Sequence, residues 1–236
     1  MQKYRKREKR VKAIFFSDFD GTVTKKDVIE SIMSYFAPPH WKNIHNSLIR
    51  GKLDIDVGIR MMFNLIPCDS KEEIIKWCLE NVELREGFGE FLQYLNSKGV
   101  HFVILSGGLD FYIYPLLHRY LNLIHKIHCN RFRCYNGKMD LFFTYRCNCK
   151  CRRNCGTCKL YVIQKYYKNY SLKFYAGDGI TDLDACQYND IIFSTGGLTG
   201  YLKKYKNKRT RHFETFYDVI NAMEEMERES YYEKSL

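Results

Sequence analysis

The stretch VKAIFFSDFDGTVT at residues 11–24 decides the fold that we expect for this chain. Its first half, VKAIFFS, is a mostly apolar run of strand length, and such runs are typical of strands buried on both faces of a sheet. The run leads directly into Asp18 and Asp20, whose side chains point to the same side of an extended chain. Two carboxylates there are costly unless a cation or a proton compensates their charge. The stretch therefore predicts a buried strand with a polar site at its end.

Three further apolar runs end in small or acidic residues in the same way. They are HFVIL before Ser106, LKFYA before Gly177 and Asp178, and DIIFS before Thr195. Apolar residues at helical spacing lie between the runs, at 29–36, 88–95 and 160–167, and after the last run, at 219–223. Strands that alternate with helices imply a parallel sheet with right-handed crossovers. We therefore expect an α/β fold with a doubly wound, Rossmann-like parallel sheet.

Residues 25–85 interrupt this alternation. They contain helical patterns and turn signals but no convincing buried strand, so we expect a helical cap inserted after the first strand. The catalytic core would then consist of 11–24 and 86–228, with a cysteine-rich segment at 147–158. Residues 1–10 and 229–236 are expected to be polar tails.

Lysine and arginine outnumber aspartate and glutamate by 38 to 27, which gives a formal net charge of +11. The excess is concentrated at 3–12 and 203–211. Such patches fit either nucleic-acid binding or a solvated surface that attracts small anionic substrates. Neither patch carries a recognisable nucleic-acid-binding motif. We therefore expect a surface that attracts small anionic substrates, and no nucleic acid.

No apolar run approaches the roughly 20 residues needed to span a bilayer. The segment AIFFSDFDG, which follows the basic N-terminus, is too short and too acidic for a secretory signal. We therefore expect no membrane partner and a cytoplasmic protein, in which most cysteines would be thiols or metal ligands.

The strand ends predict where the chemistry lies. Ligands of open parallel sheets bind beyond the carboxyl ends of the strands. Asp18, Asp20, Ser106, Asp178 and Asp182 should therefore converge at one sheet edge. Each of these residues is common in an ordinary structural role, and only their combination and order is informative. Four carboxylates at one edge call for a hard cation with oxygen ligands, and Mg²⁺ fits.

Carboxylates also act as covalent nucleophiles, including in aspartyl-phosphate chemistry. A second carboxylate can protonate the leaving oxygen and then activate water. Ser106, followed by Gly107 and Gly108, offers a hydroxyl and backbone amides to an anion at a helix start. Lys159 would neutralise charge on a transferring phosphoryl group. The sequence therefore predicts a phosphatase whose partner is a small phosphorylated metabolite.

Four pieces of the sequence resemble the motifs of the haloacid dehalogenase-like phosphatases. They are DFDGTVT at 18–24, SGG at 106–108, Lys159, and GDGITD at 177–182. The resemblance implies that Asp18 is the nucleophile and Asp20 the general acid and base. It also implies that Ser106, Gly107 and Lys159 hold the phosphoryl group.

The same resemblance implies a metal site. Mg²⁺ would bind Asp18, the backbone carbonyl of Asp20, and Asp178, with Asp182 as a further ligand or as support for the ligands.

The position of the cap resembles the phosphoserine-phosphatase-like branch, in which a helical cap closes over a small substrate. An acidic residue follows the nucleophile by nine positions in that branch, where Asp27 stands here and glutamate is common. A substrate-holding cap arginine has its counterpart in Arg60. The alternative for Arg60 is an ordinary ion pair.

Further pieces resemble the family of 2-hydroxy-3-keto-5-methylthiopentenyl-1-phosphate phosphatases of methionine salvage. They are FAPPHW at 36–41, REGF at 85–88, SGGLDFYIYP at 106–115 and the cysteines before Lys159. Apolar cap residues would then either face a methylthio group or form the core of the cap; they are Phe36, Trp41, Met61, Met62 and Phe63. Phosphoethanolamine/phosphocholine and phosphoserine phosphatases are the alternatives. A non-catalytic anion-binding or nucleic-acid-binding protein is a distant one.

Five cysteines lie close together before the first turn of the helix at 160–167. They are Cys147, Cys149, Cys151, Cys155 and Cys158. Four thiolates suffice for a structural Zn²⁺ site, while disulfides and reactive thiols are the alternatives. The other cysteines, at 68, 78, 129, 134 and 186, are scattered and expected to pack as small hydrophobic residues.

Overall fold

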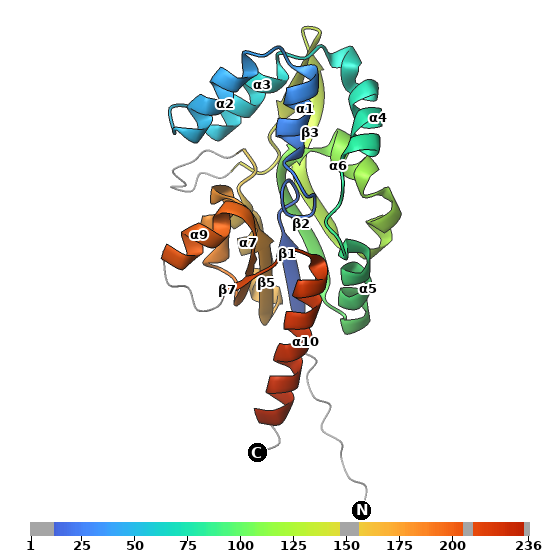
Figure 1. Cartoon of the computed structure of the whole chain (residues 1–236), viewed down its shortest axis with the longest axis vertical. Helices are drawn as coiled ribbons and strands as arrows, with labels where there is room; N and C mark the ends of the chain where they lie inside the picture. Colours follow the sequence, from blue (N-terminus) through green and yellow to red (C-terminus); the bar gives the residue numbers. More distant parts are fainter. Residues whose placement is uncertain (1–11, 147–155, 205–209, 234–236) are drawn as a thin grey trace, which may run out of the picture.

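A computed structural model describes residues 12–146, 156–204 and 210–233 of the chain (Figure 1). The strands in these ranges are β1 (Ala13–Ser17), β2 (His101–Leu109), β3 (Lys126–Tyr135), β4 (Lys138–Phe142), β5 (Leu172–Gly177), β6 (Ile191–Ser194) and β7 (Thr210–His212). The α-helices are α1 (Val28–Phe36), α2 (Trp41–Ile49), α3 (Ile55–Phe63), α4 (Lys71–Asn81), α5 (Phe88–Lys98), α6 (Asp110–Leu116), α7 (Lys159–Tyr166), α8 (Leu183–Cys186), α9 (Gly196–Lys204) and α10 (Phe216–Glu233). Short 3-10 helices are η1 (Cys68–Ser70), η2 (His118–Leu123), η3 (Tyr167–Asn169) and η4 (Ile180–Asp182).

The described strands form one sheet in the order β4-β3-β2-β1-β5-β6-β7. Neighbouring strands are parallel, except for β3 and β4, which pair antiparallel. The predicted α/β fold with a doubly wound parallel sheet is confirmed, because helices cover both faces of this sheet (Figure 1). The antiparallel edge strand is an addition that the alternation of strands and helices did not predict.

Strand β1 at the centre of the sheet is buried along its whole length, because its side chains alternate between two hydrophobic clusters. On one face the ring centroids of Phe15 and of Phe91 on α5 are 4.9 Å apart. On the other face the ring centroids of Phe16 and of Tyr166 on α7 are 5.7 Å apart. Packing on both faces explains why this stretch of sequence is continuously apolar. It also fixes the position of the carboxyl end of β1, where Asp18 follows.

Residues 25–85 supply α1 to α4, which lie beyond the carboxyl ends of β1 and β2 (Figure 1). The two connections to the core run side by side: the Lys25 amide donates to the Glu83 carbonyl at 3.0 Å, and the Arg85 amide to the Val23 carbonyl at 2.7 Å. Helical structure was predicted for this segment, and its described helices agree. The exact bounds of cap and core stay a prediction, because part of another segment packs against the same helices.

That other segment is the hairpin of β3 and β4. Strand β3 pairs with β2 as far as Asn130 and with β4 from Arg131 onward, so one strand runs from the core to the cap. The amide of Cys68 donates to the Gly137 carbonyl at 3.0 Å, and the amide of Met139 to the Ile66 carbonyl at 2.9 Å. The hairpin therefore extends the cap.

A disulfide joins Cys68 to Cys134, with the Cα atoms 5.5 Å apart. The prediction that these two cysteines pack as separate hydrophobic residues is wrong. They are 66 residues apart, and only the folding of the hairpin against the cap brings them together. Cys78, Cys129 and Cys186 are buried, as predicted.

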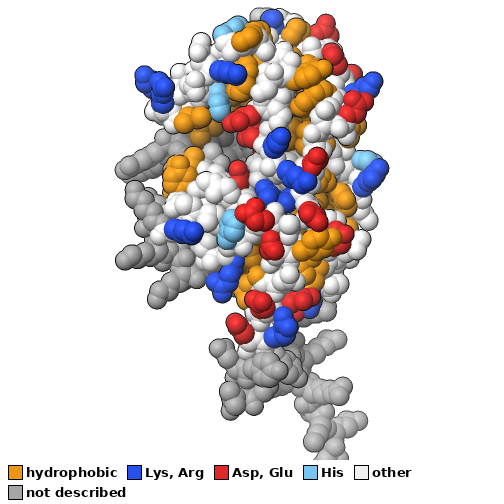
Figure 2. All heavy atoms as spheres, in the orientation of Figure 1, with side chains coloured by type: hydrophobic (Ala, Val, Ile, Leu, Met, Phe, Trp, Pro, Cys, Tyr) orange, Lys and Arg blue, Asp and Glu red, His pale blue; other side chains and the backbone are white. Residues whose placement is uncertain are grey.

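The surface in the view of Figure 2 carries basic and acidic side chains interspersed with one another. Most of the basic stretches at 3–12 and 203–211 lie outside the described residues, so their role stays open. Within the described ranges, the apolar length that a membrane-crossing helix requires is not found in any helix.

Candidate active site

A cavity of about 360 Å³ lies where the core strands end and the cap helices begin. Its core wall includes Asp18, Asp20, Gly107, Lys159 and Asp178. Its cap wall comes from α1, α2 and α3 and the turns beside them. Residues from distant parts of the sequence therefore surround one cavity, at the strand ends where the sequence predicted them to meet.

Asp18 follows β1, and its position is fixed by three contacts. Its amide donates to the Ala176 carbonyl of β5 at 2.9 Å, and its Oδ1 accepts the Phe19 amide at 2.7 Å. The same oxygen lies 2.8 Å from Nζ of Lys159, at the start of α7. The carboxylate is thus buried against the core but lines the cavity, as a nucleophile must.

Lys159 bridges Asp18 and Asp182, with its Nζ 2.6 Å from Oδ1 of Asp182. Burial lowers the pKa of this ammonium, but the attraction of the two carboxylates outweighs burial, so the pKa is raised. Lys159 therefore stays charged at neutral pH. It is the only lysine or arginine lining the cavity in the part of the chain that the structure describes.

Asp182 is fully buried and does not line the cavity. Besides Lys159, its carboxylate accepts the Tyr175 hydroxyl at 2.5 Å and the amides of Asp178 and Gly179 at 3.2 and 3.0 Å. These bonds occupy both oxygens. Of the two roles implied for Asp182, support of neighbouring groups is the one that this arrangement favours.

Asp178 approaches the loop after Asp18 closely. The Thr22 hydroxyl donates to Oδ1 of Asp178 at 3.2 Å. Gly21 has a φ of 80°, and a Cβ there would lie 2.5 Å from Oδ2 of Asp178. Glycine is therefore required at this position both for its backbone conformation and for the close approach.

Oxygens of Asp18, Asp178 and Asp182 lie within 4.8 Å of one another. Burial raises the pKa of Asp18, although Lys159 opposes this, and repulsion by Asp182 and Asp178 raises it further. Burial and then Asp182 raise the pKa of Asp178 to about 6. One lysine cannot balance these carboxylates. The residues therefore fit a hard divalent cation with oxygen ligands, of which Mg²⁺ is the predicted one.

Asp20 is buried at the cavity wall, and both of its oxygens accept hydrogen bonds. The Ser106 hydroxyl donates to Oδ2 at 2.9 Å, and the Tyr112 hydroxyl to Oδ1 at 3.0 Å. Burial and then the charge of Asp27 raise the pKa of Asp20 to about 7, against the effect of those hydrogen bonds. A carboxyl with such a pKa can give and take a proton near neutrality.

The predicted anion-binding segment, residues 106–108, has a different backbone conformation from the one expected. The strand predicted to end before Ser106 continues as β2 through both glycines to Leu109, and α6 begins only at Asp110. The expectation of a helix start at Ser106 is therefore wrong: β2 continues across a register shift between Leu105 and Leu109, and Leu109 pairs with Asn130 of β3. Gly107 nevertheless lines the cavity.

Asn130, at the point where β3 changes its pairing from β2 to β4, holds the anion-binding segment in place. Its side-chain Nδ2 donates to the Gly107 carbonyl at 2.8 Å, and its Oδ1 accepts a hydrogen bond from the Thr157 hydroxyl at 2.8 Å. Asn130 and Thr157 are buried, and Gly107 is partly exposed. Sequence analysis missed Asn130, because a single asparagine within a strand carries no signal of its partners.

Arg85, from the sequence piece REGF, holds the loop that follows Asp20. Its Nε donates to the Thr22 carbonyl at 2.8 Å and its Nη2 to the Gly21 carbonyl at 2.6 Å. Arg85 therefore connects the end of the cap to the loop beside the carboxylates.

The cap wall is mainly apolar, with contributions from Ile29, Ile59 and Met62. One polar pair interrupts it, in which Nε2 of His45 lies 2.9 Å from Oε1 of Glu30. Trp41 also lines the cavity and places its ring centroid 5.5 Å from that of His45.

Asp27 lines the cavity too and caps α1, where its Oδ1 accepts the Glu30 amide at 2.8 Å. Of the apolar residues singled out from the sequence, Phe36, Met61 and Phe63 do not line the cavity.

Arg60 lies outside the cavity lining. It donates to Oδ2 of Asp140 at 3.2 Å and to the Leu141 carbonyl at 3.1 Å, both on β4. Its guanidinium also lies over the Phe143 ring. Arg60 thus makes the ion pair that was the alternative to a substrate-binding role.

Of the cysteine-rich segment, Cys147, Cys149, Cys151 and Cys155 lie outside the described residues. Cys158 is buried and caps α7, where its Sγ accepts the Tyr161 amide at 3.4 Å. The structural zinc site therefore stays a prediction.

The comparisons with known proteins agree with this geometry. Residues 15–187 match the model of the haloacid dehalogenase-like hydrolase family. Proteins named 2-hydroxy-3-keto-5-methylthiopentenyl-1-phosphate phosphatase, from Bacillus cereus (strain G9842) and Bacillus anthracis, are 37% identical over 213 residues. These alignments cover 89% of this chain and 95% of each relative.

Solved structures show the same fold at lower identity. A phosphoserine phosphatase with a phospho-aspartyl intermediate analogue superimposes with a TM-score of 0.67 at 18% identity, over 90% of this chain and 99% of that one. A phosphoserine phosphohydrolase-like protein from Francisella tularensis gives 0.63 at 21% identity, over 89% and 99%.

Proposed function

Because the chain belongs to the haloacid dehalogenase-like hydrolase family, we propose that it is a Mg²⁺-dependent phosphatase that forms an aspartyl-phosphate on Asp18. The observation that carries this proposal is the placement of Asp18 in the cavity wall, 2.8 Å from Lys159. Asp20, with its pKa raised to about 7, lines the same cavity. A nucleophile, a cation for the phosphoryl group and a proton donor thus share one space.

In the first step, an Asp18 oxygen bonds to phosphorus as the bond from phosphorus to the ester oxygen breaks. Asp20 donates its proton to that leaving oxygen. In the second step, Asp20 takes a proton from water, and the water oxygen attacks the phosphorus of the aspartyl-phosphate. Inorganic phosphate leaves and Asp18 is regenerated. Lys159, Ser106 and Gly107 hold the phosphoryl oxygens throughout.

Mg²⁺ would be held by Asp18 and Asp178 together with the Asp20 backbone carbonyl, which the resemblance implies. When bound, it would neutralise charge on the phosphoryl group. Asp182 would keep Lys159 and the backbone at 178–179 in place, since its carboxylate already accepts hydrogen bonds from both.

We propose that the substrate is 2-hydroxy-3-keto-5-methylthiopentenyl-1-phosphate, a small metabolite in the cytoplasm. The names of the 37% identical relatives support this choice. The cap wall supports it too, because an apolar surface suits the methylthio end. The pair of His45 and Glu30 can form hydrogen bonds with the carbonyl and hydroxyl groups.

A second candidate is phosphoethanolamine or phosphocholine. Asp27 and Glu30 give the cap wall two carboxylates, and Trp41 offers an aromatic face, which together suit a cationic head group. Phosphoserine fits less well, because its carboxylate needs a cation and Lys159 already serves the phosphoryl group.

A comparison of kcat/KM for the four esters tests the substrate. We expect the methylthio enol phosphate to exceed phosphoethanolamine, phosphocholine and phosphoserine by at least about tenfold, or roughly 1.4 kcal/mol of transition-state binding. Equal or faster turnover of one of the other three would reject this substrate. It would leave the phosphatase proposal intact.

A further inference from the structure

Asp20 receives one of its two hydrogen bonds from a residue to which the proposed mechanism gives no part. Tyr112, on α6, is fully buried and does not line the cavity. Its hydroxyl donates to Oδ1 of Asp20 at 3.0 Å. We infer that Tyr112 is the positioning residue that keeps the Asp20 carboxyl aligned for proton transfer when Ser106 turns to the phosphoryl group. This inference rests on the proposed phosphatase mechanism.

Ser106 cannot hold both groups, because its hydroxyl has a single hydrogen. In the structure that hydrogen is donated to Oδ2 of Asp20 at 2.9 Å. If the hydrogen moves to a phosphoryl oxygen, Asp20 loses this bond at the moment when its orientation matters. Ser106 is as deeply buried as Tyr112 and does not itself line the cavity, but it is bonded to Gly107, which does. Neither Tyr112 nor its neighbours in the chain line the cavity, so its hydroxyl cannot be diverted in the same way.

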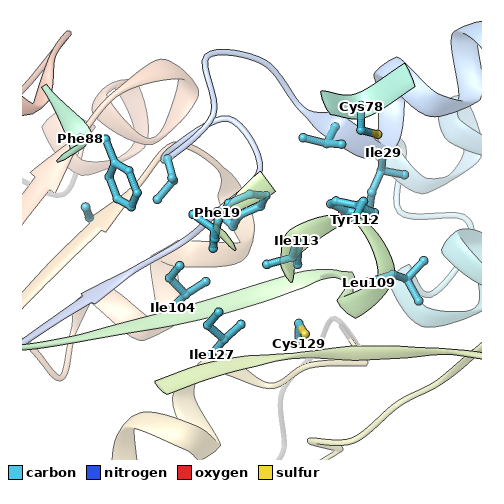
Figure 3. Packing of buried hydrophobic residues seen from close by; sticks show 14 of the residues in the cluster. Phe19, Ile29, Cys78, Phe88, Ile104, Leu109, Tyr112, Ile113, Ile127 and Cys129 are labelled. Carbon is cyan, nitrogen blue, oxygen red and sulfur yellow. The ribbon is translucent and has the colours of Figure 1, made fainter. Parts of the chain in front are cut away.

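The packing around Tyr112 fixes its hydroxyl. Tyr112 belongs to the same buried hydrophobic cluster as Ile29 of α1 and Cys78 of α4, and Figure 3 shows the three side chains in the same part of it. A ring confined between core and cap has few other orientations, so its hydroxyl stays on Asp20.

Gly108 provides a second, independent observation. A Cβ at this position would lie 1.9 Å from the Tyr112 hydroxyl oxygen and 2.8 Å from Oδ2 of Asp20. The backbone at Gly108 is not left-handed, so glycine is required there for space and not for conformation. The second glycine of the SGG piece therefore admits the hydrogen bond between Tyr112 and Asp20.

Tyr175 offers a contrast within the same site. It is also fully buried, but its hydroxyl donates to Asp182, which holds Lys159. Loss of the Tyr175 hydroxyl should weaken the stabilisation of every phosphoryl group equally. In kcat/KM, which reports the steps up to departure of the leaving group, loss of the Tyr112 hydroxyl should matter only where the leaving oxygen needs a proton.

The test compares Tyr112→Phe with the wild type, both with Mg²⁺, on phenyl phosphate and p-nitrophenyl phosphate. These esters are similar in shape, but phenolate is much more basic than p-nitrophenolate and needs protonation more. Since general acid catalysis contributes roughly 10²–10⁴-fold, we expect kcat/KM to fall by at least about tenfold for phenyl phosphate and by no more than about twofold for the nitrophenyl ester.

Two other tyrosines serve as controls. Tyr114→Phe, on the exposed side of α6, should leave both rates unchanged. Tyr175→Phe should lower the rates of both esters by the same factor. A Tyr112→Phe variant that loses both rates equally, or neither, would overturn the inference.

Gly108→Ala repeats the test without changing the tyrosine, and it serves if Tyr112→Phe does not fold. The new methyl group displaces the Tyr112 hydroxyl and also crowds Oδ2 of Asp20, so the same selective loss in kcat/KM for phenyl phosphate is expected, and an equal loss on both esters would overturn the inference. Failure of the proposed function would look different, because the wild type would then hydrolyse neither ester.

Discussion

The two walls of the cavity are built in different ways. On the core wall every charged group that we assign to the chemistry is held by at least one short contact, as Asp18 is by Lys159 and Asp20 by Ser106 and Tyr112. The cap wall is an apolar surface with one polar pair, His45 and Glu30. The difference suggests that the core determines which reaction occurs and that the cap determines which ester is admitted.

The largest expected effect is on the core wall. Asp18→Asn keeps the shape of the side chain but removes the attacking charge, so kcat should fall by at least about 10³-fold for every ester. Single-turnover and steady-state assays with p-nitrophenyl phosphate measure this loss. If the variant kept a tenth of the wild-type rate, Asp18 would not be the nucleophile.

Removal of the metal tests the charge balance of the same wall. Activity should be lost in EDTA and return with Mg²⁺, but return poorly with Ca²⁺, whose coordination is larger and looser. Retention of full activity after exhaustive chelation would contradict the metal site.

The chelated protein should also respond to pH. Burial raises the pKa of Asp20 to about 7 and that of Asp178 to about 6. The folded chain then binds more protons than the unfolded chain between about pH 4 and pH 7, so stability falls as the pH rises through this window. Thermal unfolding should show a melting temperature that is lower at pH 7 than at pH 5, and Mg²⁺ should reduce the difference.

A smaller and selective effect is expected on the cap wall. His45→Ala leaves Glu30 without its partner, so kcat/KM for the methylthio enol phosphate should fall by about tenfold while that for p-nitrophenyl phosphate changes by less than about threefold. Turnover of phosphoethanolamine should improve relative to both, because the unpaired carboxylate attracts its ammonium. His118→Ala, at an exposed position of the core, is the matched control. An equal loss on all esters would remove the distinction between the walls.

The core wall was largely predictable because parallel strands have their carboxyl ends at one edge. Asp18, Asp178 and Gly107 lie there as a consequence of topology alone. The contacts that fix them were not predictable. Nothing in the spacing of Asn130 and Tyr112 indicates that one reaches Gly107 and the other Asp20, because their partners are distant in the sequence.

The cap wall was predicted less well. Helical spacing indicates which residues share a face, but it does not say whether that face meets the cavity or the interior of the cap. Trp41 and Met62 line the cavity, whereas Phe63 is buried and Met61 is exposed. Arg60 pairs with Asp140 on β4, and Cys68 forms its disulfide with Cys134 on β3. Both partners are distant in the sequence, so periodicity could not identify them.

The strand β3 has a consequence for how this fold can be re-engineered. A chimaera that exchanges residues 25–85 alone would sever the disulfide from Cys68 to Cys134 and would lose the backbone hydrogen bonds between 66–68 and 137–139. The transplantable module is therefore discontinuous, comprising the helical insert and the hairpin of residues 131–142. Because Asn130 marks the junction, a graft made after it would exchange the cap wall while the host kept the hydrogen bond from Asn130 to Gly107.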